Sequence, residues 1–280
     1  MDIEKADKRR FLGGAALAGI GLTAMSLHRP AHAQVLESGI DPNSVLAKVK
    51  KGGTLQIGYA QNPIWFFKDP KTGELQGVYK DLADLLAADL EMTPKYQEVN
   101  FGNATVSLRK HDFDVFAASF SYTAARGLVV NFVGPIWAKG SLAIIHQDDA
   151  AKYKTLADLN KSDVTIAVSA GTVEEGRMHV LFPKAKVLSV AGQPSLAVEP
   201  VRTRRAAAYW SGDIDIRSLA KRNTWSRVMD SDHPFDRRPN TWAIRHGDQA
   251  WKDFLDMWIA SALANGVVDR LYKSYVERLT

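Results

Sequence analysis

Two serines and an arginine lie close together in the segment 112–135. Ser119 and Ser121 are two residues apart, so in an extended strand both side chains point to the same side. Arg126 follows after a short turn, and a planar guanidinium can hold a carboxylate through two parallel hydrogen bonds. This spacing predicts a binding site for a carboxylate.

A second group suited to an anion lies further along the chain. Gly171 and Thr172 precede a predicted helix over 173–181, and the first N–H groups of a helix favour negative charge. An arginine on one side and a helix N-terminus on the other could grip one carboxylate from both sides. The stretch lacks the Lys-Ser/Thr pair that a phosphate-binding loop needs, so nucleotide binding is not predicted.

Strands and helices alternate along the chain around these groups. Period-two and buried patterns predict strands at 54–59, 95–99, 115–118, 141–145, 164–168, 186–190 and 206–210. Helical spacing predicts helices at 78–90, 105–110, 173–181, 194–205, 248–265 and 267–278. This alternation predicts an α/β fold with crossover connections.

The composition narrows the function classes. The chain has 280 residues, 46% of them hydrophobic, and a formal net charge of +5, which is too mild to indicate nucleic-acid binding. It has no cysteine, so disulfides and thiolate metal sites are excluded. Its seven histidines show no metal-binding spacing. We expect no cofactor and no metal.

The first 33 residues have the pattern of an export signal. Basic Lys8-Arg9-Arg10 precedes an apolar run over 11–27, and Ala31-His32-Ala33 forms a cleavage pattern. The run is shorter than the ~20 residues that span a bilayer. We expect cleavage after Ala33 and a periplasmic protein; the basic residues resemble a twin-arginine signal, and the general route remains an alternative.

The segment 112–135 resembles the family 3 bacterial extracellular solute-binding proteins, which serve polar amino-acid importers. The resemblance rests on Asp114, the Thr-x-x-Arg block ending at Arg126, the Phe132–Pro135 stretch and the later Gly171-Thr172, and it covers about 54–280. It implies that Arg126 and the hydroxyls of Ser119 and Thr172, or backbone groups beside them, hold the ligand's carboxylate. Ser121 is a further candidate for this role.

The resemblance also implies a two-lobed periplasmic-binding-protein fold with two hinge strands and a ligand cleft between the lobes. Lobe 1 is expected at 54–142 plus 238–280 and lobe 2 at 143–237, after a leader at 34–53. Ligand would close the hinge, and the closed protein would deliver its ligand to the permease of an ABC transporter. We expect a monomer that meets the membrane only through this partner.

The resemblance places three aromatic residues in the ligand cleft. Tyr59, Trp65 and Phe120 fall where the family lines this cleft, whereas Trp137 and Trp210 are expected in the core. Family members that import cationic amino acids often carry an acidic residue near Tyr59, so a basic ligand side chain is disfavoured.

The sequence departs from the family where an aspartate usually holds the ligand's α-ammonium. Gly212 takes this place by counting, and Asp213 falls one residue late. Either Asp213 still reaches the ammonium, or the ligand is a carboxylate without an amino group.

Two other functions remain open on the same fold. Cyclohexadienyl dehydratases resemble this family, and Glu174 or Asp213 could supply their acid. A binding protein that serves a sensory receptor or a periplasmic dehydrogenase is the other alternative. A non-enzymatic binding protein remains the first expectation.

Overall fold

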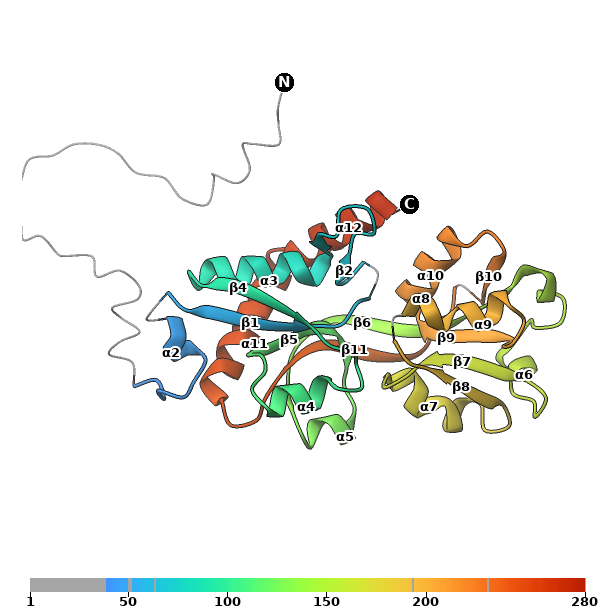
Figure 1. Cartoon of the computed structure of the whole chain (residues 1–280), viewed down its shortest axis with the longest axis horizontal. Helices are drawn as coiled ribbons and strands as arrows, with labels where there is room; N and C mark the ends of the chain where they lie inside the picture. The colour runs from blue at the N-terminus through green and yellow to red at the C-terminus, as the bar shows by residue number, and fades with distance from the viewer. Residues whose placement is uncertain (1–38, 50–51, 63, 193, 231, 280) are drawn as a thin grey trace, which may run out of the picture.

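The computed structural model describes residues 39–49, 52–62, 64–192, 194–230 and 232–279. The predicted export signal and its cleavage site lie outside these residues. The described chain forms two α/β lobes side by side, joined by long strands (Figure 1). Each lobe has a sheet covered by helices on both faces, as expected from the alternating pattern.

One sheet path runs through both lobes in the order β4-β1-β5-β11-β6-β9-β7-β8, with β10 paired to β6. The first lobe uses β1 (Thr54–Tyr59), which is parallel to β4 (Thr93–Glu98) and β5 (Val115–Ser121). Its helices are α3 (Val78–Asp89), α4 (Ala104–Arg109), α5 (Ala124–Gly127), α11 (Gln249–Ala264) and α12 (Val267–Leu279), and a short ribbon joins β2 (Phe67–Lys68) to β3 (Leu75–Gln76).

The second lobe is built around β7 (Thr165–Ser169), which is parallel to β8 (Lys186–Val190) and β9 (Ala208–Gly212). Its remaining elements are η2 (Gln147–Asp149), α6 (Leu156–Leu159), α7 (Val173–Leu181), α8 (Pro194–Ala197), α9 (Glu199–Arg202), α10 (Asp213–Arg222) and β10 (Ser226–Met229). Two apolar clusters, one containing Trp210 and one containing Tyr209, pack on the sheet.

Two strands pass from one lobe to the other. β6 (Asn131–His146) pairs with β11 (Phe235–Ile244) in its first part and with β9 and β10 in its last part. The β6–β11 register is interrupted between Phe235 and Arg238, near the point where β6 changes partners. These are the two strands about which the lobes can rotate.

The segment ahead of β1 packs on the first lobe. It contains α2 (Leu46–Val49), and Val45 and Val49 are buried in that lobe's core. Ser44 Oγ donates to Asp248 Oδ1 at 2.7 Å, and the Val45 N–H donates to Oδ2 of the same carboxylate at 2.8 Å. Asp248 therefore joins this segment to the start of α11.

The predicted helix over 194–205 is two short helices, α8 and α9. Pro200 lies in the first turn of α9, where it needs no helical N–H, but a continuous helix would place it in the interior. The sequence patterns also gave no expectation for α10, β10 or β11. β11 has the sequence FDRRPNTWAI, and its Arg-Arg-Pro-Asn stretch lacks the alternation of apolar and polar residues that predicts a strand. The strand forms because it pairs with β5 on one side and with β6 on the other.

Candidate functional site

A small polar cavity of ≈ 20 Å³ lies where the two lobes meet. From the first lobe and the crossing strand it is lined by Asn62, Phe101, Ser119, Ser121, Arg126 and Lys139. From the second lobe it is lined by Ser169, Thr172, Val173, Glu174, Ser211 and Asp215. Since one water needs roughly 10–15 Å³ on this measure, the lobes are closed tightly over the site.

Arg126 is held in the cavity by contacts with both lobes. Thr123 caps the short helix α5 and fixes the turn that follows β5, because its Oγ1 accepts from the Arg126 N–H at 3.1 Å. Nη1 donates to the Ser121 carbonyl at 2.8 Å, and Nη2 donates to the Gly171 carbonyl across the cleft at 2.9 Å. The guanidinium lies 4.0 Å from the ring centroid of Phe120.

The positive charge of Arg126 is only partly compensated. Burial lowers its pKa to about 10, with the charge of Glu174 opposing the shift. Among the ion pairs of the described residues, none joins Arg126 to a carboxylate. An incoming carboxylate would supply the missing charge, and the N–H groups not used on carbonyls could hold it.

The two predicted serines lie within β5, on one side of the strand. Ser119 Oγ accepts from Asn240 Nδ2 at 2.8 Å, which leaves its own proton available to an acceptor. Ser121 Oγ is buried and makes no hydrogen bond with a described residue. Buried hydroxyls are normally bonded, so a ligand is the partner this one best fits.

Thr172 begins α7 at the opposite wall. Its Oγ1 donates to the Ser169 carbonyl at 2.7 Å and accepts from the Glu175 N–H at 3.3 Å. The next two residues, Val173 and Glu174, also line the cavity, and first-turn N–H groups have no acceptor within the helix. Thr172 therefore fixes the helix start, and the adjacent N–H groups favour an anion.

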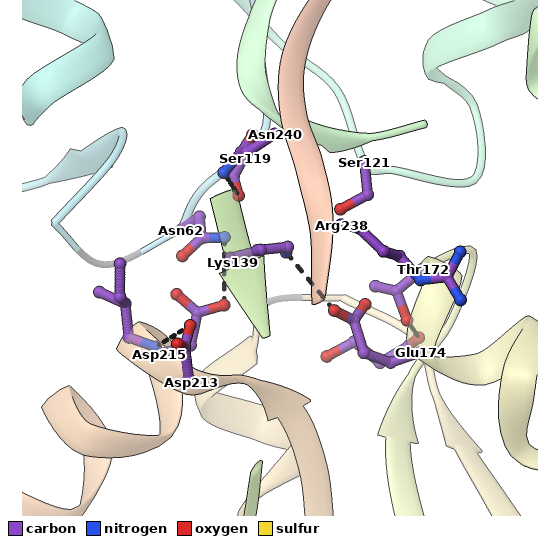
Figure 2. Close-up of polar contacts among 12 residues, drawn as sticks. Asn62, Ser119, Ser121, Lys139, Thr172, Glu174, Asp213, Asp215, Arg238 and Asn240 are labelled. Atoms are coloured by element: carbon purple, nitrogen blue, oxygen red, sulfur yellow. Dashed lines mark hydrogen bonds and ion pairs between the residues drawn. The ribbon is translucent and has the colours of Figure 1, made fainter. Parts of the chain in front are cut away.

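Lys139, which the sequence did not single out, enters the middle of the site from β6. Its Nζ lies 3.4 Å from Glu174 Oε1, and the two side chains are 9% and 6% exposed. Figure 2 shows Lys139 extending toward Glu174, with the contact between Asn62 and Asp215 drawn to the left of Lys139. A buried cation and a buried carboxylate from different lobes thus lie side by side.

Asp215, also unexpected, is the carboxyl at the far end of the site. Asn62 Nδ2 donates to Asp215 Oδ2 across the cleft at 3.3 Å. Burial raises the pKa of Asp215 to about 7, Lys139 acts to lower it, and the charges of Glu174 and Asp213 act to raise it. A positive charge placed beside this carboxyl would favour its ionised form.

Gly212 and Asp213 do not line the cavity. Asp213 Oδ1 accepts from the Ile214 N–H at 2.9 Å at the start of α10, whereas Ser211 and Asp215 face the site. Ser211 from the end of β9 and Asp215 from the first turn of α10 therefore line the cavity, whereas Asp213 does not. The structure thus brings together four of the predicted residues: Ser119, Ser121, Arg126 and Thr172.

The three predicted aromatic residues lie outside the cavity lining. Tyr59 is 2% exposed, stacks on Phe66 with ring centroids 4.3 Å apart, and donates to Glu98 at 3.1 Å. Trp65 is 1% exposed and packs on Tyr79 in the core of the first lobe. Phe120 is fully buried beneath Arg126, so it supports the guanidinium rather than the cavity wall.

Three of the unexpected residues have only a weak signal in the sequence. Lys139 lies between Ala138 and Gly140 in a mainly apolar strand, and such a lysine is a candidate for a buried charge. Asp215 follows Asp213 at the same spacing as the two serines, but without α10 this pattern did not indicate which carboxylate faces the cleft. Asn62 came from a turn with no distinctive pattern.

Residues 55–278 match the bacterial extracellular solute-binding proteins, family 3, and this match spans more than half of the chain. The chain belongs to this family. The resemblance inferred from the sequence is confirmed.

Relatives in the family share most of the length of this solute-binding protein. The ABC transporter glutamine-binding protein GlnH of Bacillus subtilis is 22% identical over 236 residues, which are 83% of this chain and 84% of that protein. Cyclohexadienyl dehydratase of Pseudomonas aeruginosa is 20% identical over 256 residues, which are 91% and 92% of the two chains. The crystal structure of an ancestral amino-acid-binding protein, described as a precursor of cyclohexadienyl dehydratase, is 29% identical with a TM-score of 0.76, covering 83% of this chain and 99% of that one. The predicted fold class is confirmed.

The described residues form neither a membrane-spanning helix nor a cluster of metal ligands. No helix in ranges 39–49, 52–62, 64–192, 194–230 and 232–279 has the length and apolarity to cross a membrane. The same part of the chain holds no group of three or more His, Cys, Asp or Glu side chains that could bind a metal ion.

Proposed function

We propose that this solute-binding protein captures a small α-amino acid and delivers it to the permease of an ABC importer. The observation that carries the proposal is the Arg126 guanidinium, which lines the cavity between the lobes without a carboxylate ion pair among the described residues. A ligand carboxylate fits this cation through charge-assisted hydrogen bonds.

Asp215 supports a ligand that also carries an ammonium group. Burial raises its pKa to about 7, which shows that its environment compensates a negative charge poorly. The site therefore offers a cation at one end and a carboxyl at the other, as a zwitterion requires. Asp215 would then bind the ligand's α-ammonium, the role for which Asp213 was the candidate in the sequence.

Closure follows from contacts that need both lobes. Arg126 reaches the Gly171 carbonyl and Asn62 reaches Asp215, so each bond exists only when the lobes meet. A ligand bound to Arg126 and to the N-terminus of α7 would favour the closed form by its difference in affinity for the two forms. The permease could recognise that form.

The lobe boundaries and cell compartment belong to the same proposal. We assign 54–142 plus 238–280 to lobe 1 and 143–237 to lobe 2, and we add 39–49 to lobe 1 because Asp248 binds that segment. We also propose export to the periplasm, cleavage after Ala33 and a monomeric mature protein. The membership of an extracellular family supports this placement.

A thermal-shift panel tests the function directly. The panel holds the common amino acids together with carboxylates and keto acids that lack an amine. At 100 times its dissociation constant a ligand stabilises by about 2.7 kcal/mol, so we expect a rise in Tm of roughly 5–10 °C for at least one amino acid. Shifts only with amine-free carboxylates would contradict the role of Asp215, and no shift at all would contradict the proposed function.

The affinity for an amino acid should depend on pH through Asp215. In the closed, ligand-free form its pKa is about 7, and a bound ammonium would lower it, so below this pH binding must release a proton. We therefore expect affinity to fall about tenfold between pH 8 and pH 6 and to change little above pH 8. Isothermal titration calorimetry at three pH values measures this.

Asp215→Asn should weaken binding and remove this pH dependence. Asp213→Asn is the comparison variant, because Asp213 lies in the first turn of α10 and outside the cavity lining. It should retain the pH dependence with a midpoint moved to lower pH, because the charge of Asp213 helps to raise the pKa of Asp215. If Asp213→Asn removed the dependence and Asp215→Asn preserved it, the ammonium would belong to Asp213.

The relationship to cyclohexadienyl dehydratase does not extend that activity to this chain at 20% identity. Of the two acids considered for it, Glu174 is paired with Lys139 and Asp213 lies outside the lining. A sensory or accessory role would use the same solute site with a different partner.

A further inference from the structure

The Lys139 side chain lines the cavity between the lobes, together with Arg126 and Asp215. Lys139 is 7% exposed as a whole residue and comes from the crossing strand β6, one residue before Gly140. Its ammonium contacts Glu174 of α7 at 3.4 Å. With the lobes closed, only ≈ 20 Å³ remains beside it.

Lys139 also lies close to Asp215. A Cβ built on Gly212 would lie 3.3 Å from Lys139 Nζ and 3.1 Å from Asp215 Oδ2, so both atoms converge on the same point above β9. The charge of Lys139 acts on the Asp215 carboxyl in the direction that favours its ionised form. The Lys139 ammonium therefore pairs with Glu174 and also lies near Asp215.

We infer that Lys139 is a tethered cationic occupant of the side-chain subsite and that it determines specificity by excluding amino acids with cationic side chains. Its ammonium takes the place that the ammonium of a diamino acid would fill between Glu174 and Asp215. A second cation there would be repelled by Lys139, and the butyl chain of Lys139 fills the space that a long side chain needs. We expect amino acids with short, uncharged side chains to bind.

This inference rests on the proposed amino-acid function, but its test is independent of it. Lys139→Ala removes the cation and opens space while leaving Glu174 and Asp215 in place. We expect this variant to bind L-2,4-diaminobutyrate or L-ornithine at least about tenfold more tightly than the wild type, as measured by calorimetry at pH 8. Lys139→Arg, which keeps the charge, should show no gain.

A second substitution shows whether the gain arises from the carboxylates. In the Lys139→Ala background, Glu174→Gln should weaken diamino-acid binding about tenfold, because it removes one of the two negative groups. Thermal unfolding shows whether each variant folds, and Lys139→Ser replaces Lys139→Ala if the latter does not.

The outcomes separate the two proposals. A folded Lys139→Ala or Lys139→Ser protein without any gain overturns the role of Lys139, even when the wild type binds neutral amino acids. An equal gain in Lys139→Arg also overturns it. A gain in Lys139→Ala beside a wild type that binds no amino acid supports the role of Lys139 and contradicts only the proposed function.

Discussion

Arg126→Ala should reduce the affinity for the amino-acid ligand on the order of 100-fold or more. The guanidinium is placed to give a carboxylate two charge-assisted hydrogen bonds, each contributing roughly 1.5–3 kcal/mol. The variant also loses the 2.9 Å bond from Nη2 to the Gly171 carbonyl, which joins the lobes when they close. Calorimetry with the ligand found in the panel gives the size of the loss.

Arg126→Lys separates charge from geometry. A lysine keeps the positive charge but cannot form two parallel bonds, so we expect an intermediate loss of roughly tenfold. Arg177→Ala is the matched control: Arg177 pairs with Asp236 at 3.3 Å and does not line the cavity, so affinity should stay near the wild-type value. Equal affinity of wild type and Arg126→Ala would remove Arg126 from the site.

Gly171→Ala should prevent full closure. Gly171 has φ +73°, and a Cβ at this position would lie 2.5 Å from both Cα and N of Gly102 in the other lobe. These are backbone atoms that cannot move aside as a side chain could. In the open form the substitution causes only the strain of a left-handed residue, roughly 1–2 kcal/mol, so the protein should still fold.

The consequence of Gly171→Ala should appear in both affinity and shape. We expect an affinity loss on the order of 100-fold, because the closed form, in which both lobes can contact the ligand, is blocked. In small-angle X-ray scattering the wild type should contract on ligand addition and the variant should not.

Gly176→Ala is the matched control for this experiment. Gly176 lies in α7, a few residues from Gly171, and a Cβ there would meet no atom within 4 Å. Its affinity and its contraction should equal those of the wild type. Contraction of the Gly171→Ala protein would show that Gly102 and Gly171 do not meet in the ligand-bound form.

Four residues predicted from the sequence line the cavity, and local geometry positions each of them. Ser119 and Ser121 share one side of β5, and Arg126 follows within one short helix, so their arrangement is fixed by a few consecutive residues. Thr172 is likewise placed by the helix that it caps. Such short-range relations can be read from spacing.

The residues that sequence analysis missed depend on contacts between distant segments. Lys139 reaches the cavity only because β6 crosses from lobe to lobe and brings this side chain to Glu174. Asp215 reaches the cavity only because α10 starts directly after β9 and turns this side chain toward Asn62. Tyr59 and Trp65 were predicted to line the cavity but pack in the core. An aromatic residue in a core and one in a pocket have the same sequence signal, so the sequence does not distinguish them.

The docking of residues 39–49 and of α12 on the first lobe determines how the molecule carries mechanical load. Asp248 ties the early segment to α11, and α12 packs along α3, so both ends of the described chain belong to one lobe (Figure 1). The second lobe is a loop in the chain path, entered through β6 and left through β11. Tension applied between the ends is therefore borne by the first lobe, while the second lobe and the joint between them stay outside the line of force.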